Sequence, residues 1–224
     1  MLVFTDDDVL VEPDWLGRLV DALLAAPERT VVTGTVLPAT TDGHVPSVTY
    51  RTHAEVFCGR PFADPLFPNN MAVARGAFEE VGLFDERLGA GAAFPAAEDN
   101  DFGYRLLEAG WRIAFVPDAV LHHRGVRRGR DLAALDWAYG RGQGAFYAKH
   151  MSIADRHMLR RLRRNAWFRL RRIPPALLGR REALREAVYL AGLVAGVLGW
   201  WRHEGRHPDR AAVARLAPRP RSRP

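Results

Sequence analysis

The sequence predicts an α/β protein in which a mainly parallel sheet with covering helices is followed by a helical extension. Two observations lead to this prediction. Through residue 123, short apolar runs alternate with helical patterns, which is typical of a parallel sheet with helical crossovers. From about residue 131, apolar residues recur at helical spacing and arginines become frequent. The 224 residues are enough for one sizeable domain with an appendage.

The elements of the first half can be placed from apolar spacing and from Pro and Gly punctuation. Strands are expected over residues 2–4, 30–38, 69–75, 112–117 and 119–123, and helices over 12–27, 76–82 and 98–110. Two loops are expected, a long one with short extended pieces over 39–67 and a mobile, Gly-rich one over 85–97. This half forms the first predicted domain, residues 1–130.

The second half is predicted to be helical and basic over residues 131–203. Its segments are 131–150, 154–172 and 181–203, and the GRGQG run at 140–144 indicates helical packing or a turn rather than a nucleotide loop. Gly192, Gly196 and Gly199 allow close helix packing. Residues 204–224 are predicted to be a disordered basic tail.

Charge and composition bound the function. Residues 1–125 carry a net charge of −10 and residues 126–224 one of +16, which suggests cation or substrate chemistry in the first part and an anionic partner for the second. Cys58 is the only cysteine, so a disulfide framework is excluded and a reducing compartment fits. Lys149 is the only lysine, which leaves almost none for Schiff-base or P-loop chemistry.

Three carboxylates, Asp6 to Asp8, directly follow the first apolar strand. Ligands of open α/β sheets bind beyond the carboxyl ends of the strands. Mg²⁺ or Mn²⁺ takes carboxylate oxygens and shares its other positions with phosphates. A divalent cation would therefore offset the repulsion between these carboxylates. The alternative is a solvated capping turn before the next helix.

A second acidic cluster, Glu98 to Asp101, follows the Gly-rich loop at an expected helix start. Acids are common in the first turn of a helix, which is the structural alternative. Glycosyl transfer needs a carboxylate that takes the proton of the acceptor hydroxyl, and this cluster offers one. The preceding loop could move to admit and cover an acceptor.

Two polar pairs complete the candidate residues. His122 and His123 end a strand and face opposite ways, so one of them is expected to enter the site as a third metal ligand. Asn69 and Asn70 open another strand, where they could bond to sugar or phosphate oxygens or simply form a turn.

The order of FTDDDV, NNMAVARGAFEEVGLFDERLGAG and EDNDFGYRLLEAGWRIAFVPDAVLHH resembles the family 2 glycosyltransferases of GT-A fold, over about residues 2–150. The resemblance implies a partial GT-A, Rossmann-like domain. It implies that Asp6 and Asp7 hold the nucleotide, that Asp8 and His123 bind Mg²⁺ or Mn²⁺, with His122 as the second choice, and that Asp99 is the catalytic base. Acceptor binding or site support is assigned to Glu98, Asp101 and Asn70.

The resemblance also implies a chemistry: a sugar passes from a nucleotide-sugar donor to a glycan or lipid-linked acceptor in one inverting displacement. Family members carry a nucleotide-binding region of about a hundred residues before the first acidic motif, so the chain is expected to be the downstream part of a longer protein. Ala97 stands where glycine is frequent, which could stiffen the loop.

Two other functions are compatible with parts of the sequence. A Mg²⁺-dependent phosphatase of the haloacid dehalogenase type is disfavoured because Leu10 replaces the expected Thr or Val and Lys149 lies after both acidic motifs. An inactive or partner-dependent fragment could instead act as a basic binding module. Eleven arginines lie between Arg156 and Arg185. Nucleic acid is the less favoured partner because no recognised module is present.

The favoured partner of the basic half is an anionic membrane surface, with Trp200 and Trp201 at the interface and arginines on anionic lipid. The apolar run Ala187 to Trp201 is too short to cross a bilayer. The alternative is a helix packed on the catalytic domain. The expected location is the cytoplasm, peripheral on the inner face of the plasma membrane.

Overall fold

The computed structural model describes residues 1–152, 154–176 and 179–206. The chain divides into two compact units. The sheet unit contains Met1–Leu83 and Phe102–Asp131, and the helical unit contains Phe84–Asp101 and the residues from Leu132 onward. The predicted domain boundaries stay predictions, but the segment with the second acidic cluster belongs to the compact unit that also holds the C-terminal helices.

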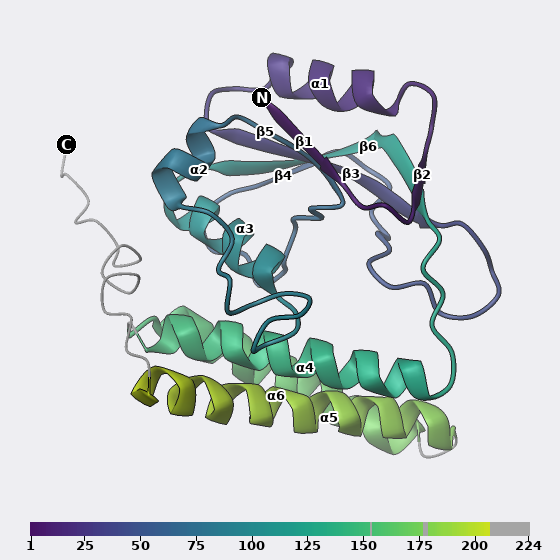
Figure 1. Cartoon of the computed structure of the whole chain (residues 1–224), viewed down its shortest axis with the longest axis vertical. Helices are drawn as coiled ribbons and strands as arrows, with labels where there is room; N and C mark the ends of the chain where they lie inside the picture. Colours follow the sequence, from purple (N-terminus) through teal and green to yellow (C-terminus); the bar gives the residue numbers. More distant parts are fainter. Residues whose placement is uncertain (153, 177–178, 207–224) are drawn as a thin grey trace. The chain divides into compact units, whose positions relative to one another are not determined.

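The sheet unit holds six strands and the helices that cover them (Figure 1). The strands are β1 (Leu2–Thr5), β2 (Val9–Val11), β3 (Thr30–Pro38), β4 (Glu55–Phe57), β5 (Asn70–Val73) and β6 (Arg112–His123). The order along the sheet is β1-β5-β3-β6-β2, and β4 also pairs with β6. The α/β class is confirmed.

The sheet is mixed. Its longest pair, β3 with β6, is parallel, as expected for the sheet core, whereas β1, β2 and β4 at the periphery and β5 pair antiparallel with their neighbours. The antiparallel pairs join strands that are far apart in the chain: β1 pairs with β5, β2 and β4 pair with β6, and β5 pairs with β3.

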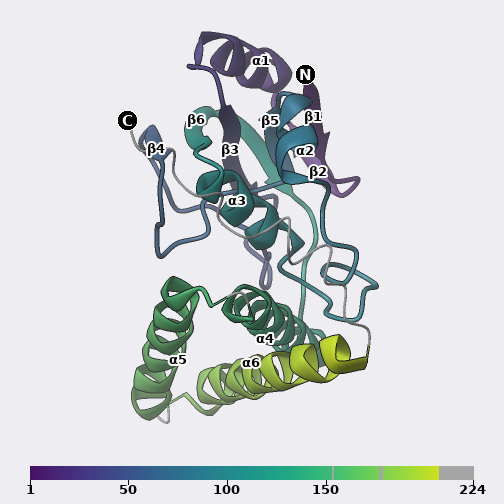
Figure 2. The same cartoon turned by 90° about the vertical axis from the view of Figure 1, so that its left-hand side faces the viewer.

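Helices cover both faces of this sheet (Figure 2). On one face, α1 (Trp15–Ala25) packs its buried Trp15 and Leu19 over Val32, Val36 and neighbouring apolar side chains. On the other face lie α2 (Gly76–Val81) and the part of α3 (Glu98–Glu108) from Phe102 on. There the Phe78 ring stacks on that of Phe102 with centroids 4.8 Å apart. The alternation of side chains along each strand produces these two apolar faces.

The two strands predicted at 112–117 and 119–123 form one strand, β6. The prediction of a break was wrong because the irregularity is a bulge. Gly34 pairs with Val116 and Thr35 with Val120, so residues 117–119 have no paired residues on β3. Pro117 has no N–H to donate to the ladder, which places the bulge there. A Cβ at Gly34 would lie 2.3 Å from the Ala119 carbonyl oxygen, so the close approach requires glycine.

The helical unit consists of α4 (Arg130–Met151, from Leu132 on), α5 (Arg156–Ala176) and α6 (Arg180–Arg206), together with the 84–101 segment. The helical extension is therefore confirmed. Residues 204–206 belong to α6 instead of the predicted tail, and the rest of that tail, 207–224, lies outside the described residues.

Glycines join α4 to α6. A Cβ at Gly144 would lie 2.1 Å from the carbonyl oxygen of Leu193, and one at Gly196 would lie 2.0 Å from that of Arg141. The two backbones therefore touch, as expected from the glycine spacing. One helix of the described residues, Arg180–His203, is long and apolar enough to cross a membrane, and 39% of its most apolar window is buried. Length and composition alone do not separate a span from a core helix.

The loop 85–97 is folded around the core of the helical unit. Leu88 and Phe94 form a parallel bridge, and both side chains are buried with Trp200 and the alanines of α4. The Phe94 and Trp200 rings lie 5.5 Å apart. Trp200 is 1% exposed, so its expected place at a membrane interface is wrong: the helical unit uses this side chain as core, whereas Trp201 is 51% exposed.

Candidate functional site

The pairing of β2 with β6 brings the first acidic cluster to the end of β6. Val9 lies opposite His123 in the antiparallel register, and the N–H of Arg124 donates to the carbonyl oxygen of Asp8 at 2.8 Å. The residue just before β2 therefore lies beside the last residue of β6, although 115 positions separate them in the chain. The sequence analysis missed β2 because three apolar residues between acidic stretches give little periodic signal.

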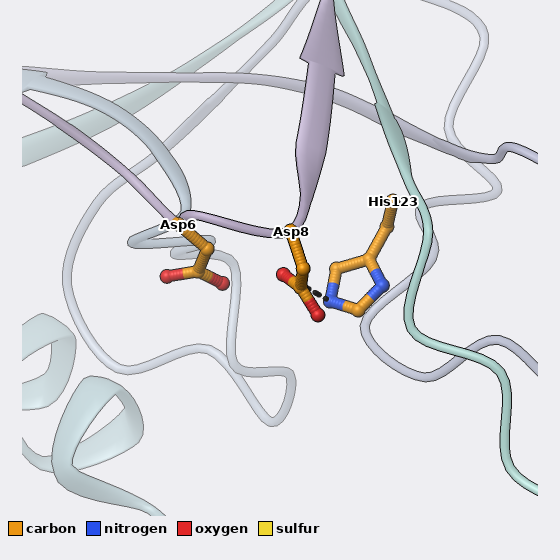
Figure 3. Close-up of side chains that lie close together, drawn as sticks. All are labelled: Asp6, Asp8 and His123. Carbon is orange, nitrogen blue, oxygen red and sulfur yellow. Dashed lines mark ion pairs between the residues drawn. The ribbon is translucent and has the colours of Figure 1, made fainter.

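Asp6, Asp8 and His123 form one group in the sheet unit (Figure 3). One ligand atom from each residue lies within 4.8 Å of the others. The Nε2 atom of His123 is 3.6 Å from Oδ1 of Asp8. His123 is buried, Asp8 is half-buried and Asp6 is exposed, so solvent reaches the group from the side of Asp6. The structure therefore brings together both carboxylates and the favoured histidine.

The electrostatics of this group favour a bound cation. Partial burial of the Asp6 carboxyl raises its pKa, and so do the negative charges of Asp8 and Asp7, while His123 opposes the shift. Two carboxylate oxygens are ligands that suit Mg²⁺ or Mn²⁺, and an imidazole nitrogen beside them favours the transition metal of the two, Mn²⁺. A divalent ion would remove the repulsion that raises this pKa. The residues present thus fit the expected metal.

Gly125 sets the orientation of the His123 ring. Its N–H donates to Nδ1 at 3.0 Å, and a Cβ at this position would lie 2.5 Å from Cε1 of the ring. In a neutral imidazole this bond leaves the proton on Nε2, which faces Asp8. A cation bound at Nε2 requires the other tautomer, with the proton on Nδ1. Binding of a cation at Nε2 therefore requires a change of tautomer, in which the Nδ1 atom gives up the bond from Gly125.

The remaining candidates of the first cluster lie apart from this group. His122 faces away from His123, and its Nε2 lies 2.8 Å from Oε1 of Glu12. This matches the alternation expected along a strand and leaves His123 as the metal-ligand candidate. Asp7 is exposed in the turn between β1 and β2. Its proposed part in nucleotide binding stays a prediction.

The two asparagines differ sharply. Asn70, the one selected from the sequence, is completely buried: Oδ1 accepts from the indole N–H of Trp15, and Nδ2 donates to the carbonyl oxygens of Thr35 and Ala119, each at 2.8 Å. It holds the β6 bulge together. Asn69 is 5% exposed, and within the described part of the chain neither its Nδ2 nor its Oδ1 has a hydrogen-bond partner. A buried amide without partners is rare, and Asn69 is the one left available to a ligand.

The second acidic cluster lies at the start of α3, in the helical unit. Oδ1 of Asp99 accepts from the N–H of Asn100 at 2.7 Å, and the side chain is half-buried. Ala97 has φ of 75°, a left-handed conformation that costs an alanine about 1 kcal/mol and explains why glycine suits this place. Gly89 has φ of 105°, and a Cβ there would lie 3.0 Å from Cδ of Glu98.

Asp101 belongs to a buried ion network that the sequence did not reveal. Lys149 Nζ lies 2.6 Å from Oδ1 of Asp101 and 2.7 Å from Oδ2 of Asp85. His150 Nε2 is 2.9 Å from the same Asp101 oxygen. The only lysine thus ties the start of the 85–97 loop to the first turn of α3. Any role of Asp101 in site support is indirect, through the position of that turn.

Opposing effects set the pKa values in this network. Burial alone would raise the pKa of Asp85, but hydrogen bonds from Arg87 and the charge of Lys149 outweigh it and lower the pKa to about 2. Burial lowers the pKa of His150, against the hydrogen bond to Asp101. His150 is therefore neutral at pH 7, and its Nε2–H donates to Asp101.

The mixed sheet, the Asp–Asp–His group and the C-terminal helices are consistent with a GT-A-like domain. The family described as glycosyltransferase like family 2 matches residues 1–145, and the chain belongs to this family. This confirms the resemblance drawn from the motifs.

Curated relatives carry a more specific name. Over 88 residues the chain is 42% identical to N-acetylglucosaminyl-diphospho-decaprenol L-rhamnosyltransferase of Mycobacterium tuberculosis, in strain CDC 1551 / Oshkosh and in strain ATCC 25618 / H37Rv. The match covers 39% of this chain and 25% of each relative. The chain thus aligns with about a quarter of the length of these relatives. No solved structure matches it.

Proposed function

We propose that this chain carries metal-binding residues and the catalytic base of a glycosyltransferase. The enzyme would move a sugar from a nucleotide-sugar donor to a glycan or lipid-linked acceptor. The observation that carries the proposal is the group of Asp6, Asp8 and His123, assembled by the β2–β6 pairing in a member of glycosyltransferase family 2. Family membership supports the reaction class. The assignment of each residue is ours.

The proposed reaction is one inverting displacement. The Asp99 carboxylate takes the proton of the acceptor hydroxyl while the acceptor oxygen forms a bond to the anomeric carbon. The bond from that carbon to the diphosphate oxygen breaks on the opposite face, and the nucleoside diphosphate leaves with the electron pair. Inversion follows because one displacement occurs and no enzyme nucleophile takes part.

The remaining residues bind or position. Asp6 and Asp7 contact the nucleotide part of the donor, and Asp8 and His123 would hold Mg²⁺ or Mn²⁺. When bound, the cation supplies positive charge that neutralises the departing diphosphate. Glu98 serves the acceptor side. Asn70 and Asp101 have indirect roles. Asn70 fixes the β6 bulge, and Asp101 fixes the first turn of α3.

The acceptor class is proposed from the relatives. Their name specifies an acceptor in which N-acetylglucosamine is joined through a diphosphate to decaprenol, a lipid. A lipid-linked acceptor for this chain would place the reaction in the cytoplasm at the inner face of the plasma membrane, in the synthesis of a cell-envelope glycan.

The test uses the full chain with Mn²⁺, a panel of nucleoside-diphosphate sugars and a synthetic polyprenyl-diphosphate N-acetylglucosamine acceptor. Asp99→Asn should lower turnover at least about 100-fold, the usual loss on removing a general base. The matched control is Asp118→Asn, the same chemical change at a carboxylate whose side chain is 74% exposed, and it should keep wild-type turnover.

Near-normal turnover by Asp99→Asn would reject the base assignment. A wild-type chain that binds Mn²⁺ but turns over none of the donors would instead favour the alternative function, a non-catalytic or partner-dependent binding module.

A further inference from the structure

The arginines of α5 divide into two sets by position on the helix. The 21 residues from Arg156 to Ala176 contain eight arginines and no Asp or Glu. One set faces the rest of the helical unit. Arg161 is 3% exposed with its guanidinium 5.5 Å from the Phe146 ring centroid, and Arg169 lies 3.9 Å over Tyr189 and 2.9 Å from a carboxylate oxygen of Glu186. These arginines pack α5 onto α4 and α6.

The other set faces solvent together with apolar side chains. We define the outer face of α5 as Arg160, Arg163, Arg164, Trp167, Leu170 and Arg171, which recur at intervals of three or four residues and are all exposed. Trp167 is 58% exposed and Leu170 55%. Two large apolar side chains thus lie exposed among four cations, on a helix that itself contains no Asp or Glu.

Arginines lie over two of the exposed rings of α5: Arg171 belongs to the outer face, and Arg172, which also pairs with Glu186, borders it. The guanidinium of Arg171 lies 4.3 Å over the Trp167 ring, and that of Arg172 lies 5.5 Å over the ring of Phe168, which borders the outer face and is 50% exposed. Such pairs orient an aromatic ring on the helix surface and keep the cation beside it. The face is therefore amphipathic along its own surface.

We propose that the outer face of α5 binds the surface of an anionic phospholipid bilayer. Trp167 and Leu170 would enter the boundary between headgroups and acyl chains, and the surrounding arginines would bind lipid phosphates. Charge complementarity selects the occupant, because a row of exposed arginines on a helix without Asp or Glu matches an anionic surface. Nucleic acid accounts for the arginines but leaves Leu170 without a role.

The surface proposed on α5 differs from the one expected from the sequence, which named Trp200 and Trp201 on α6. Trp200 is core and α6 buries its glycines against α4, whereas Trp201 is 51% exposed. The face on α5 has a moderate apolar area and a high charge, as expected of a helix that lies on a bilayer rather than across it. Vesicle binding requires neither donor nor acceptor, so it is measured independently of the proposed transfer reaction.

The experiment is flotation of the full chain with vesicles of phosphatidylcholine alone or with 30 mol% phosphatidylglycerol, at about 0.1 M salt. Binding is expected only to the anionic vesicles. Arg163→Gln with Arg171→Gln should lower the partition coefficient about thirtyfold, since each arginine near the surface contributes a little over fivefold, or about 1 kcal/mol. The matched control, Arg75→Gln with Arg112→Gln, removes the same charge from two other exposed positions and should lower it less than about threefold.

A second measurement does not depend on charge. Lipids brominated on the acyl chains quench a tryptophan that reaches them, so quenching of the wild-type protein should be lost in Trp167→Phe and kept in Trp201→Phe. Equal binding to neutral vesicles, equal losses in the two double variants, or quenching that survives Trp167→Phe would each overturn the proposal. So would salt-sensitive binding to RNA or DNA without binding to anionic vesicles.

Discussion

The carboxylates of Asp85 and Asp101 in the helical unit are surrounded by cations, whereas those of Asp6 and Asp8 in the sheet unit face each other and one histidine. The pKa of Asp85 is accordingly lowered, to about 2, and that of Asp6 is raised. Both groups look alike in the sequence, as acids beside an apolar run. Their partners differ: Asp85 and Asp101 share Lys149 in a buried ion network, whereas Asp6 and Asp8 form the group for which we propose a cation.

The largest effect is expected from breaking the paired group. Lys149→Met would leave Asp85 and the fully buried Asp101 without their common cation, which should lower the free energy of unfolding by about 3 to 5 kcal/mol. Urea unfolding of the full chain measures this. Arg75→Met, which removes a cation whose side chain is 82% exposed, should cost less than about 1 kcal/mol. Equal losses in both variants would contradict a structural network.

The same contrast of partnered and unpartnered groups separates Asn70 from Asn69. Asn70→Ala strands three buried groups and should lower the free energy of unfolding by about 3 kcal/mol. Asn69→Ala strands none and should change it by less than about 0.5 kcal/mol. The two variants compared by urea unfolding form their own control, and a loss for Asn69→Ala as large as that for Asn70→Ala would refute the contrast.

Binding of a cation to the group of Asp6, Asp8 and His123 should neutralise its carboxylates and stabilise the folded protein. At 100 times its dissociation constant, Mn²⁺ should raise the free energy of unfolding by about 2.7 kcal/mol. Thermal unfolding at several Mn²⁺ concentrations gives this value. The rise should vanish in Asp8→Asn and persist in His122→Ala, because His122 pairs with Glu12 and lies outside the group. Persistence in Asp8→Asn would place the cation elsewhere.

The two groups should respond to acid with opposite signs. The lowered pKa of Asp85 corresponds to about 2 kcal/mol of stability, which is present above pH 4 and is lost as the pH falls toward about 2. The raised pKa of Asp6 works the other way, because ionisation above pH 4 costs the folded state more than the unfolded one. Between pH 6 and pH 2.5, the free energy of unfolding measured in urea should therefore change less with pH in Asp85→Asn than in the wild type. In Asp6→Asn it should change more. The same change of slope in both variants would show that the groups do not differ.

Periodic apolar patterns predicted most of the fold because burial of apolar side chains is what those patterns encode. The strand at residues 30–38 and the three C-terminal helices were placed within a few residues. Short or irregular elements escaped for the opposite reason. β2 has only three residues, and the bulge at Pro117 resembles a strand break when only the chain itself is considered.

The candidate metal ligands were also predictable as residue types, since acids after a strand and a histidine at a strand end are local features. The choice between neighbours was not. His123 and not His122 meets Asp8 because of the β2–β6 register, and Asn70 is saturated because a bulge 49 residues away offers its carbonyl oxygen. Such pairings join positions far apart in the chain, which local patterns do not record.

The sequence by itself determined the family, the α/β class, the acidic motifs and the division into an acidic and a basic half, because each of these is written in residue type and spacing. Only the tertiary structure decided which acids are neutralised by Lys149 and which remain for a cation, and which arginines and aromatic rings reach solvent. Those outcomes depend on burial and on partners that folding brings together. Burial and partners set the free energy of a charged or amide group in the folded protein.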